Sequence, residues 1–229
     1  MKLVLNTYSL VVFLLFLQGC TFVEWGNVTF RQAEKVSDQY AKSMRPFIKS
    51  VSIYNEFVSI AEFSALFLTD QARMIYADYF FHRNFKTDEE QEIARQKLLQ
   101  ENQHYITFYV LGYQPAVIYP YNRSMFSGEY QVQGPLLGAV DASWKITLSV
   151  DGKEYLPYDI RSVDLSAEYQ HFFALAWSQF KFAYKVRFDY FDEQGEPIIT
   201  KGPHRVVLNF SSVVYDAKLD WQNITYQMA

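Results

Sequence analysis

The residues that could supply acid–base or metal chemistry are spread along the chain. The four histidines are His82, His104, His171 and His204, and their spacing predicts no common site. The sequence also lacks a nucleophile elbow, an H-E-x-x-H zinc motif, a phosphate-binding glycine loop and an EF-hand loop. We therefore expect no enzyme activity, catalytic residue, cofactor or metal. An enzyme with a dispersed site, in which a histidine meets a carboxylate only in the folded chain, stays as an alternative.

One acidic turn could bind a hard cation. Its sequence is Asp189-Tyr190-Phe191-Asp192-Glu193, and carboxylate oxygens are ligands that Ca²⁺ prefers. The more ordinary interpretation is the solvated tip of a hairpin, because Gln194-Gly195 follows as a turn signal. Asp189 also falls on the polar face of a predicted strand, where it is a natural cross-strand partner for Lys or Arg.

A group of aromatic residues could form a ligand-binding surface. Tyr113, Tyr119, Tyr121 and Trp144 lie in or beside the long segment 114–142, which is punctuated by Pro, Gly and Tyr. Loops of this length in a compact domain are often functional, and tyrosine combines stacking with hydrogen bonding. Tyr119, Tyr121 and Trp144 are therefore candidate residues for binding a glycan or a peptide. The alternative is that these rings close the open end of the fold as core.

The only cysteine, Cys20, ends an apolar N-terminal segment. Lys2 gives a positive start, residues 10–17 are all apolar, and Leu17-Gln18-Gly19-Cys20 closes the segment. The apolar run is well short of the ~20 residues that a membrane-spanning helix needs. This pattern resembles the lipobox of bacterial lipoproteins, over the first twenty residues alone. In that family a peptidase cuts before the cysteine, and a diacylglyceryl group is attached to its sulfur.

The resemblance implies that residues 1–19 are a signal peptide and that Cys20 carries a lipid. Acyl chains add ~0.8 kcal/mol per buried CH₂, so two chains hold a protein durably at a membrane. Thr21 stands where lipoproteins retained in the inner membrane often have Asp, which implies the outer membrane, facing the periplasm. The alternative is an ordinary secretory signal in which the cysteine occurs by chance.

Composition limits the classes of partner and of fold. The formal net charge is −4 and no basic block is present, so we expect no nucleic acid partner. Half of the residues are hydrophobic and 18% are aromatic, which is enough for a sizeable core. A lone cysteine at the processing site leaves no internal disulfide, so packing alone must stabilise the domain.

Helical signals cluster in the first half of the chain. Thr29 to Gln32 fits a capping box, and apolar residues at helical spacing predict a helix from Phe30 until Pro46 ends it. Thr69-Asp70 predicts the start of a second helix that runs to about Arg83. The second capping box, at Thr87, starts a third helix to about Asn102, and the short link predicts a helical hairpin.

The remaining segments alternate between apolar and polar residues and predict strands. The expected strands are 49–54, 57–68, 106–110, 144–150, 153–160, 182–190, 206–210 and 218–226. For 57–68 the alanine content also allows a helix, because short apolar runs cannot be assigned by period alone. Asp151-Gly152 is the strongest hairpin signal, and Pro157 places the following strand at an edge.

We therefore expect a mainly β fold, an antiparallel immunoglobulin-like β-sandwich with an inserted α-helical hairpin and an N-terminal helix. The expected organisation is a signal peptide (1–19), a tether with the N-terminal helix (20–46) and a sandwich domain (47–229) with the helical hairpin at about 70–102. The leading functional hypothesis is a lipid-anchored, non-enzymatic component of the cell envelope that binds an envelope protein. Glycan or peptide recognition through 114–142 is the second hypothesis.

Overall fold

The computed structural model describes residues 38–56, 58–84, 86–114, 136–139, 142–200 and 202–225. Contacts divide the chain into two compact units, Met1–Lys42 and Ser43–Ala229, and the sheets belong to the second unit. Cys20 and most of the expected N-terminal helix lie outside the described residues. Residues 38–44 are helical, and the 3₁₀-helix η1 (Arg45–Phe47), which contains Pro46, follows them.

The described residues form two antiparallel sheets. The first contains, in spatial order, β1 (Ile48–Asn55), β2 (Val58–Phe67), β3 (Tyr105–Tyr113), β7 (Phe182–Asp189) and β6 (Asp159–Ser162). The second contains β5 (Lys153–Tyr155), β4 (Lys145–Val150), β8 (Pro203–Ser211) and β9 (Asp216–Thr225). The expectation of a mainly antiparallel β fold is therefore confirmed.

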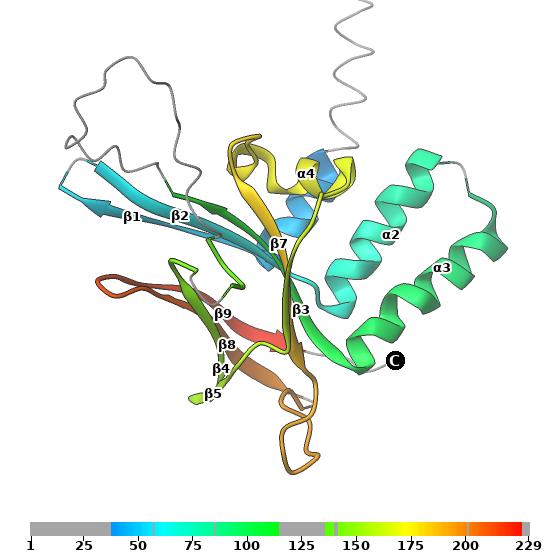
Figure 1. The fold of residues 1–229 in the computed structure, drawn as a ribbon. Helices are drawn as coiled ribbons and strands as arrows, with labels where there is room; N and C mark the ends of the chain where they lie inside the picture. Colours follow the sequence, from blue (N-terminus) through cyan, green and yellow to red (C-terminus); the bar gives the residue numbers. More distant parts are fainter. Residues whose placement is uncertain are drawn as a thin grey trace, which may run out of the picture. The chain divides into compact units, whose positions relative to one another are not determined.

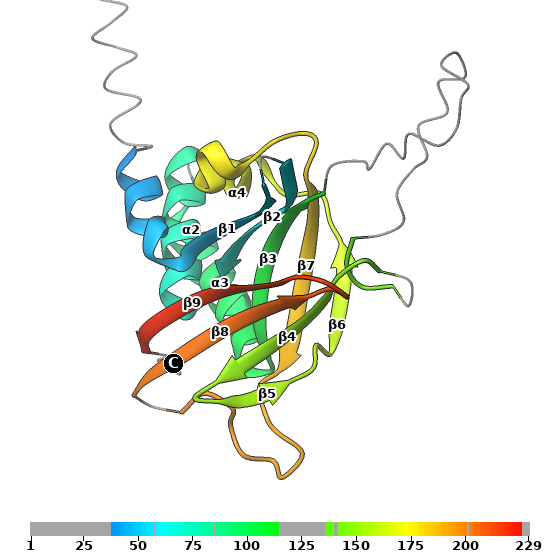
Figure 2. The same ribbon diagram turned by 90° about the vertical axis from the view of Figure 1, so that its left-hand side faces the viewer.

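The two sheets share one apolar core. Every second residue of β4 is buried, as the alternating sequence predicts. The ring of Phe63 on β2 stacks on that of Phe210 on β8, with centroids 4.2 Å apart. At the β1 and β9 edges the indole N–H of Trp221 donates a hydrogen bond to the carbonyl of Phe47 at 3.0 Å. Figure 2 shows the four-stranded sheet in front of the five-stranded sheet.

The helices lie on the outer side of the five-stranded sheet, behind it in Figure 2. The predicted hairpin is confirmed: α2 (Asp70–Asn84) and α3 (Asp88–Gln100) connect β2 to β3, and η2 (Glu101–Gln103) follows α3. The Thr69 hydroxyl accepts a hydrogen bond from the amide of Ala72, and Thr87 forms the predicted capping box with Glu90. A further helix, α4 (Ala167–Phe173), precedes η3 (Ala174–Ala176) and has no counterpart among the predicted elements.

The prediction of one return strand over 153–160 is wrong. β5 ends at Tyr155 in the four-stranded sheet, and β6 begins at Asp159 in the other sheet. Pro157 lies between them, and proline has no N–H to continue a ladder. The amide of Tyr158 instead donates to the carbonyl of Arg187 on β7 at 2.8 Å. The chain thus crosses from one sheet to the other at this point.

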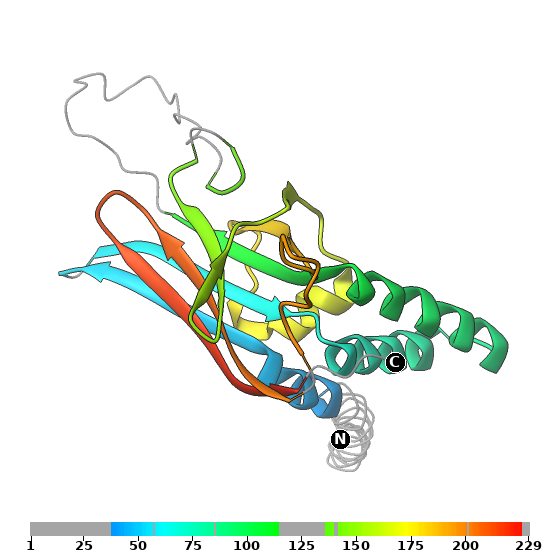
Figure 3. The same ribbon diagram turned by 90° about the horizontal axis from the view of Figure 1, so that it is seen from below.

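One hairpin from each sheet, β1–β2 and β8–β9, extends in the same direction. Figure 3 shows the β1–β2 and β8–β9 hairpins on the side opposite to the α2–α3 hairpin. The β5–β6 crossing and the connection between β7 and β8 lie away from these hairpin tips (Figure 1). The end of the sheets that contains the β5–β6 crossing and the β7–β8 connection also contains the largest of the three hollows described below.

Candidate binding site

A groove of about 630 Å³ lies between β5 and the connection that follows β7. Residues 153–156 form one wall, and Asp189, Phe191, Ile198 and residues 192–194 form the other. We call this hollow the end groove. Figures 1 and 2 show the β7–β8 connection beside β5. Its volume lies within the range of about 300–1,000 Å³ that is usual for ligand sites.

A tight turn shapes the second wall. One carboxylate oxygen of Asp192 accepts hydrogen bonds from the amides of Gln194 and Glu196, each at 3.0 Å. Gly195 completes the turn with φ +80°, a conformation that glycine adopts at no steric cost. Next to the turn, the buried Tyr190 donates its hydroxyl hydrogen to the carbonyl of Ile199 at 2.6 Å. The turn is therefore tied to the core at its base.

A second hollow, of about 260 Å³, lies beside the end groove. Its lining residues are His104, Tyr105, Asp189, Tyr190 and Phe191, and we call it the side hollow. Asp189 and Phe191 line both hollows, so the two hollows adjoin at this pair of residues.

Apolar side chains at this end are exposed. Leu156 is 78% exposed, Phe191 46% and Tyr158 58%. Leu156 and Phe191 line the end groove from its two walls. Adjacent exposed apolar side chains in a hollow are typical of binding surfaces, whereas single exposed ones are common everywhere.

The end groove has an excess of carboxylates. Lys153 is its one basic lining residue among the described ones, against the acidic Glu154, Asp189, Asp192 and Glu193. Lys153 lies 3.8 Å from Asp192, so that carboxylate is partly neutralised. Within the described part of the chain, Glu154, Asp189 and Glu193 form no ion pair.

Next to the side hollow, Arg187 stacks on two tyrosine rings. Its guanidinium carbon lies 4.8 Å from the centroid of Tyr105 and 5.9 Å from that of Tyr158. One guanidinium nitrogen also donates to Asp159 at 2.7 Å. That hydrogen bond raises the pKa of Arg187. Burial opposes ionisation of Asp159, but the hydrogen bonds from Arg187 and Arg161 outweigh it and lower the pKa of Asp159.

A second cluster of charged residues is buried under the helices. Arg73 is 2% exposed, and its Nε donates to the Asn102 side chain at 2.7 Å. The Asn102 amide in turn donates to Asp70 at 2.6 Å. The Nη2 of Arg73 lies 3.1 Å from Glu101, close enough for an ion pair but without hydrogen-bond geometry. Glu101 also pairs with Lys185 of β7, so this network attaches the helical hairpin to the sheet.

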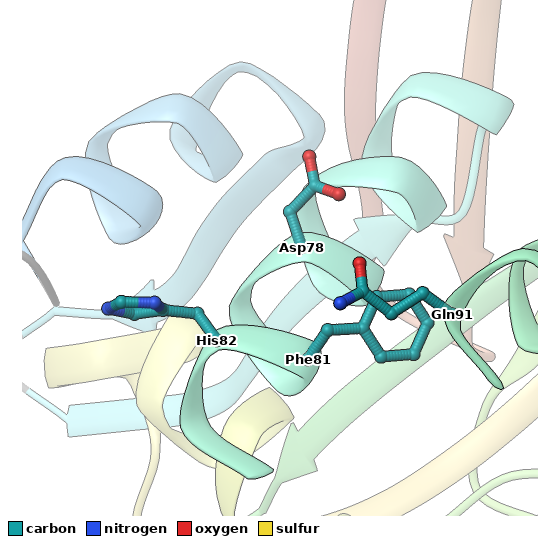
Figure 4. Close-up of a pocket in the computed structure, with 4 residues that line it drawn as sticks. All are labelled: Asp78, Phe81, His82 and Gln91. Atoms are coloured by element: carbon teal, nitrogen blue, oxygen red, sulfur yellow. The ribbon is translucent and has the colours of Figure 1, made fainter. Parts of the chain in front are cut away.

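A third hollow, of about 330 Å³, lies between α2 and α3 and is lined by Asp78, Phe81, His82 and Gln91. Figure 4 shows Phe81 and Gln91 side by side, with His82 pointing away from them. Asp78 pairs with Arg95 at 2.9 Å, and the Arg95 guanidinium lies over the Phe81 ring. The ion-pair partner of Asp78 is therefore Arg95. We call this hollow the helix cleft, and among the described residues that line it no histidine pairs with a carboxylate.

One histidine does meet a carboxylate. The Nδ1 of His204 lies 2.6 Å from Asp151, and its Nε2 lies 3.0 Å from the carbonyl of Thr200. Hydrogen bonds from His204 and from the amide of Arg205 lower the pKa of Asp151. Neither His204 nor Asp151 lines the end groove, the side hollow or the helix cleft. Both ring nitrogens contact neighbouring residues, so the pair joins the β4–β5 turn to β8.

The sequence-derived candidate site is only partly described. Cys20, Tyr119 and Tyr121 lie outside the described residues. Trp144 is 3% exposed and packs edge-on against Phe63, with centroids 5.1 Å apart. The ring of Trp144 is therefore part of the core, which agrees with the alternative interpretation that these aromatic rings close the fold and do not bind a ligand. Tyr113 ends β3 and is partly buried.

One wall of the end groove contains the acidic turn at 189–193, whose sequence allows either a Ca²⁺ ligand set or, more ordinarily, a solvated hairpin tip. Among the described residues, which include this turn, no group of three or more His, Cys, Asp or Glu side chains could hold a metal ion. The other wall, at Leu156, had no signal because its role depends on the sheet crossing after β5.

Comparison with known proteins assigns no family. No protein-family model matches the sequence, and no curated protein or solved structure matches it. In the described part of the chain, no helix has the length and apolar character needed to cross a bilayer.

Proposed function

We propose that this protein is a lipid-anchored, non-enzymatic component of the cell envelope that binds a partner protein through the end groove. The observation that carries the proposal is the groove itself, in which Leu156 and Phe191 are exposed from opposite walls. A turn tied to the core positions Phe191, so the groove is largely formed before a partner binds.

Photo-crosslinking in the native host tests this proposal. A photoreactive amino acid replaces Phe191 or Leu156, and the control position is Ile93 on α3, which is 63% exposed. We expect a specific crosslinked product from the two groove positions and none from Ile93. The same products from all three positions, or none from the groove, would reject the groove as the partner site.

The lipid anchor is proposed from Leu17-Gln18-Gly19-Cys20 and its resemblance to the lipobox. Its location in the outer membrane, facing the periplasm, is proposed on Thr21. Detergent-free fractionation tests the anchor: Cys20→Ala should move the protein from the membrane to the soluble fraction. If the variant stays with the membranes as the native chain does, the lipid is not what holds it.

Two finer expectations stay predictions. The immunoglobulin-like arrangement of the strands is one of them. The other is glycan or peptide binding through Tyr119 and Tyr121, and glycan-array binding that vanishes in Tyr119→Ala and Tyr121→Ala would support it.

A further inference from the structure

The free charges of the end groove indicate what kind of partner fits it. Glu154, Asp189 and Glu193 are exposed and form no ion pair within the described residues. They line the same groove as the exposed apolar side chains of Phe191 and Leu156. Such a surface attracts cationic groups and repels phosphates and other anions.

On the adjacent strands, one of the protein's own arginines already contacts both an aromatic ring and a carboxylate. The guanidinium of Arg187 stacks on the Tyr105 ring and hydrogen-bonds to Asp159. Asp189 and Phe191 offer the same two groups, a carboxylate and an aromatic ring, and they lie where the end groove meets the side hollow. An Arg or Lys side chain from outside can therefore make both interactions there.

Two adjoining hollows that share Phe191 favour an extended ligand. Successive side chains of an extended peptide point to opposite sides, so two neighbouring residues of the peptide can enter different hollows. The end groove of about 630 Å³ continues to Leu156, which gives an apolar surface beyond the cation position.

We propose that the end groove binds an extended segment of a partner protein in which an Arg or Lys stacks on Phe191 beside Asp189, and a nearby apolar residue packs on Leu156. This inference rests on the proposed function, because it names the chemistry of the partner at the same groove.

Fluorescence anisotropy with the full-length protein in a non-ionic detergent tests the ligand chemistry. The probe is a labelled peptide of about eight residues, ~26 Å when extended, with one Arg and one Leu among Ser and Gly. Matched probes replace Arg by Gln or Leu by Ser. We expect the Arg–Leu probe to bind at least about tenfold more tightly than the Gln probe, and its affinity to fall as salt is raised from about 50 to about 500 mM.

Variants of the protein test the position. Phe191→Ala should weaken binding of the Arg–Leu probe about two- to fivefold, through loss of the cation–π contact. Combining Glu154→Gln, Asp189→Asn and Glu193→Gln should weaken it about tenfold. Glu196→Gln is the matched control, because Glu196 is exposed in the same turn but does not line the groove, and it should leave binding unchanged.

Each remaining outcome overturns a defined part of the inference. Equal binding of the Arg and Gln probes, or unchanged binding by the triple carboxamide variant, rejects the cation site. Displacement of the peptide by spermidine at the peptide's own concentration rejects the extended peptide in favour of a small cation. A last outcome separates this inference from the proposed function. If the Arg–Leu probe fails to bind the native protein, while crosslinking from position 191 in cells persists in the triple variant, the groove still binds a partner and only the cationic chemistry of that partner is wrong.

Discussion

Arg73 carries a charged guanidinium that is almost fully buried, so its stability depends on the partners around it. Its partners are Asn102 and Glu101, which follow α3 in the sequence, so the ion pair closes the base of the helical hairpin. Removing one member of a buried pair leaves an uncompensated charge or acceptor behind.

Arg73→Met should lower the free energy of unfolding by about 3 kcal/mol, measured by urea denaturation, because Glu101 and Asn102 lose their partner. The control is Arg205→Met, which removes an ion pair with Asp220 in which the arginine side chain is 65% exposed. Exposed pairs contribute less than about 1 kcal/mol. Equal losses in the two variants would contradict a special role for the buried pair.

Stability in acid should depend on Glu101. Burial raises its pKa, but the charge of Arg73 together with the hydrogen bond and charge of Lys185 outweighs burial, so the pKa is lowered from 4.5. A carboxylate with a lowered pKa adds stability above its ordinary pKa, and this stability is lost as the pH falls through the folded pKa. Glu101→Gln should therefore reduce the decrease in unfolding free energy between about pH 5 and pH 3.

Asp70 provides a control, because its effect on the change of unfolding free energy with pH should have the opposite sign. Burial raises its pKa above 3.8, despite the hydrogen bond from Asn102 and the charge of Arg73. The folded state then takes up the proton first, and stability rises with acidification through this group. Asp70→Asn should make the acid decrease steeper. A steeper decrease in Glu101→Gln as well would refute the assignment of the acid-sensitive group.

At the scale of elements, the two predicted helix starts have the same chemistry but different surroundings. Thr69 is 2% exposed at the junction of β2 and α2. Thr87 starts α3, which has no fully buried residue. A helix without buried residues can open locally while the rest of the protein stays folded.

Thr69→Ala should lower the free energy of global unfolding by about 1–2 kcal/mol, since it removes a cap inside the packed structure. Thr87→Ala should increase hydrogen exchange in the first turn of α3 by a factor equivalent to about 1 kcal/mol, with little change in global unfolding. Hydrogen exchange by NMR and urea denaturation of both variants provide the comparison. A larger global effect from Thr87→Ala would contradict the local opening of α3.

At the scale of the whole molecule, aromatic contacts between sheets join distant parts of the chain. Phe63 touches Phe210 and Trp144, and Trp221 contacts Phe67 and Phe108. These contacts link β2 and β3 to β8, to β9 and to the residue that precedes β4, so the core depends on both sheets being present.

Phe63→Ala should lower the free energy of unfolding by about 3–5 kcal/mol, because a fully buried ring is replaced by a cavity between the sheets. The control is Phe182→Ala on β7, where the ring is 54% exposed, and its effect should stay below about 1 kcal/mol. Thermal and urea denaturation measure both variants. Similar losses would contradict the expectation that the buried ring of Phe63 stabilises the contact between the sheets.

Local patterns were sufficient for most individual elements. Helix caps and tight turns act on backbone groups a few residues away, so they can be recognised from the sequence alone. The examples here are Thr69, Thr87 and the turn Asp151-Gly152. Strand alternation is equally local, since its period of two residues sets which side chains share a face. Helix α4 was missed because its seven residues form too short a pattern, and its packing of Tyr169 on Tyr76 is long-range.

The N-terminal lipobox resemblance, the helical hairpin and the positions of most strands can be read from local patterns of residues. Which sheet each strand joins cannot, because that depends on hydrogen-bond partners far away in the chain. The amide of Tyr158 bonds to β7 and thereby divides a segment that reads as one strand. The same crossing places Leu156 opposite Phe191, so the end groove exists only after residues about 35 positions apart meet in space.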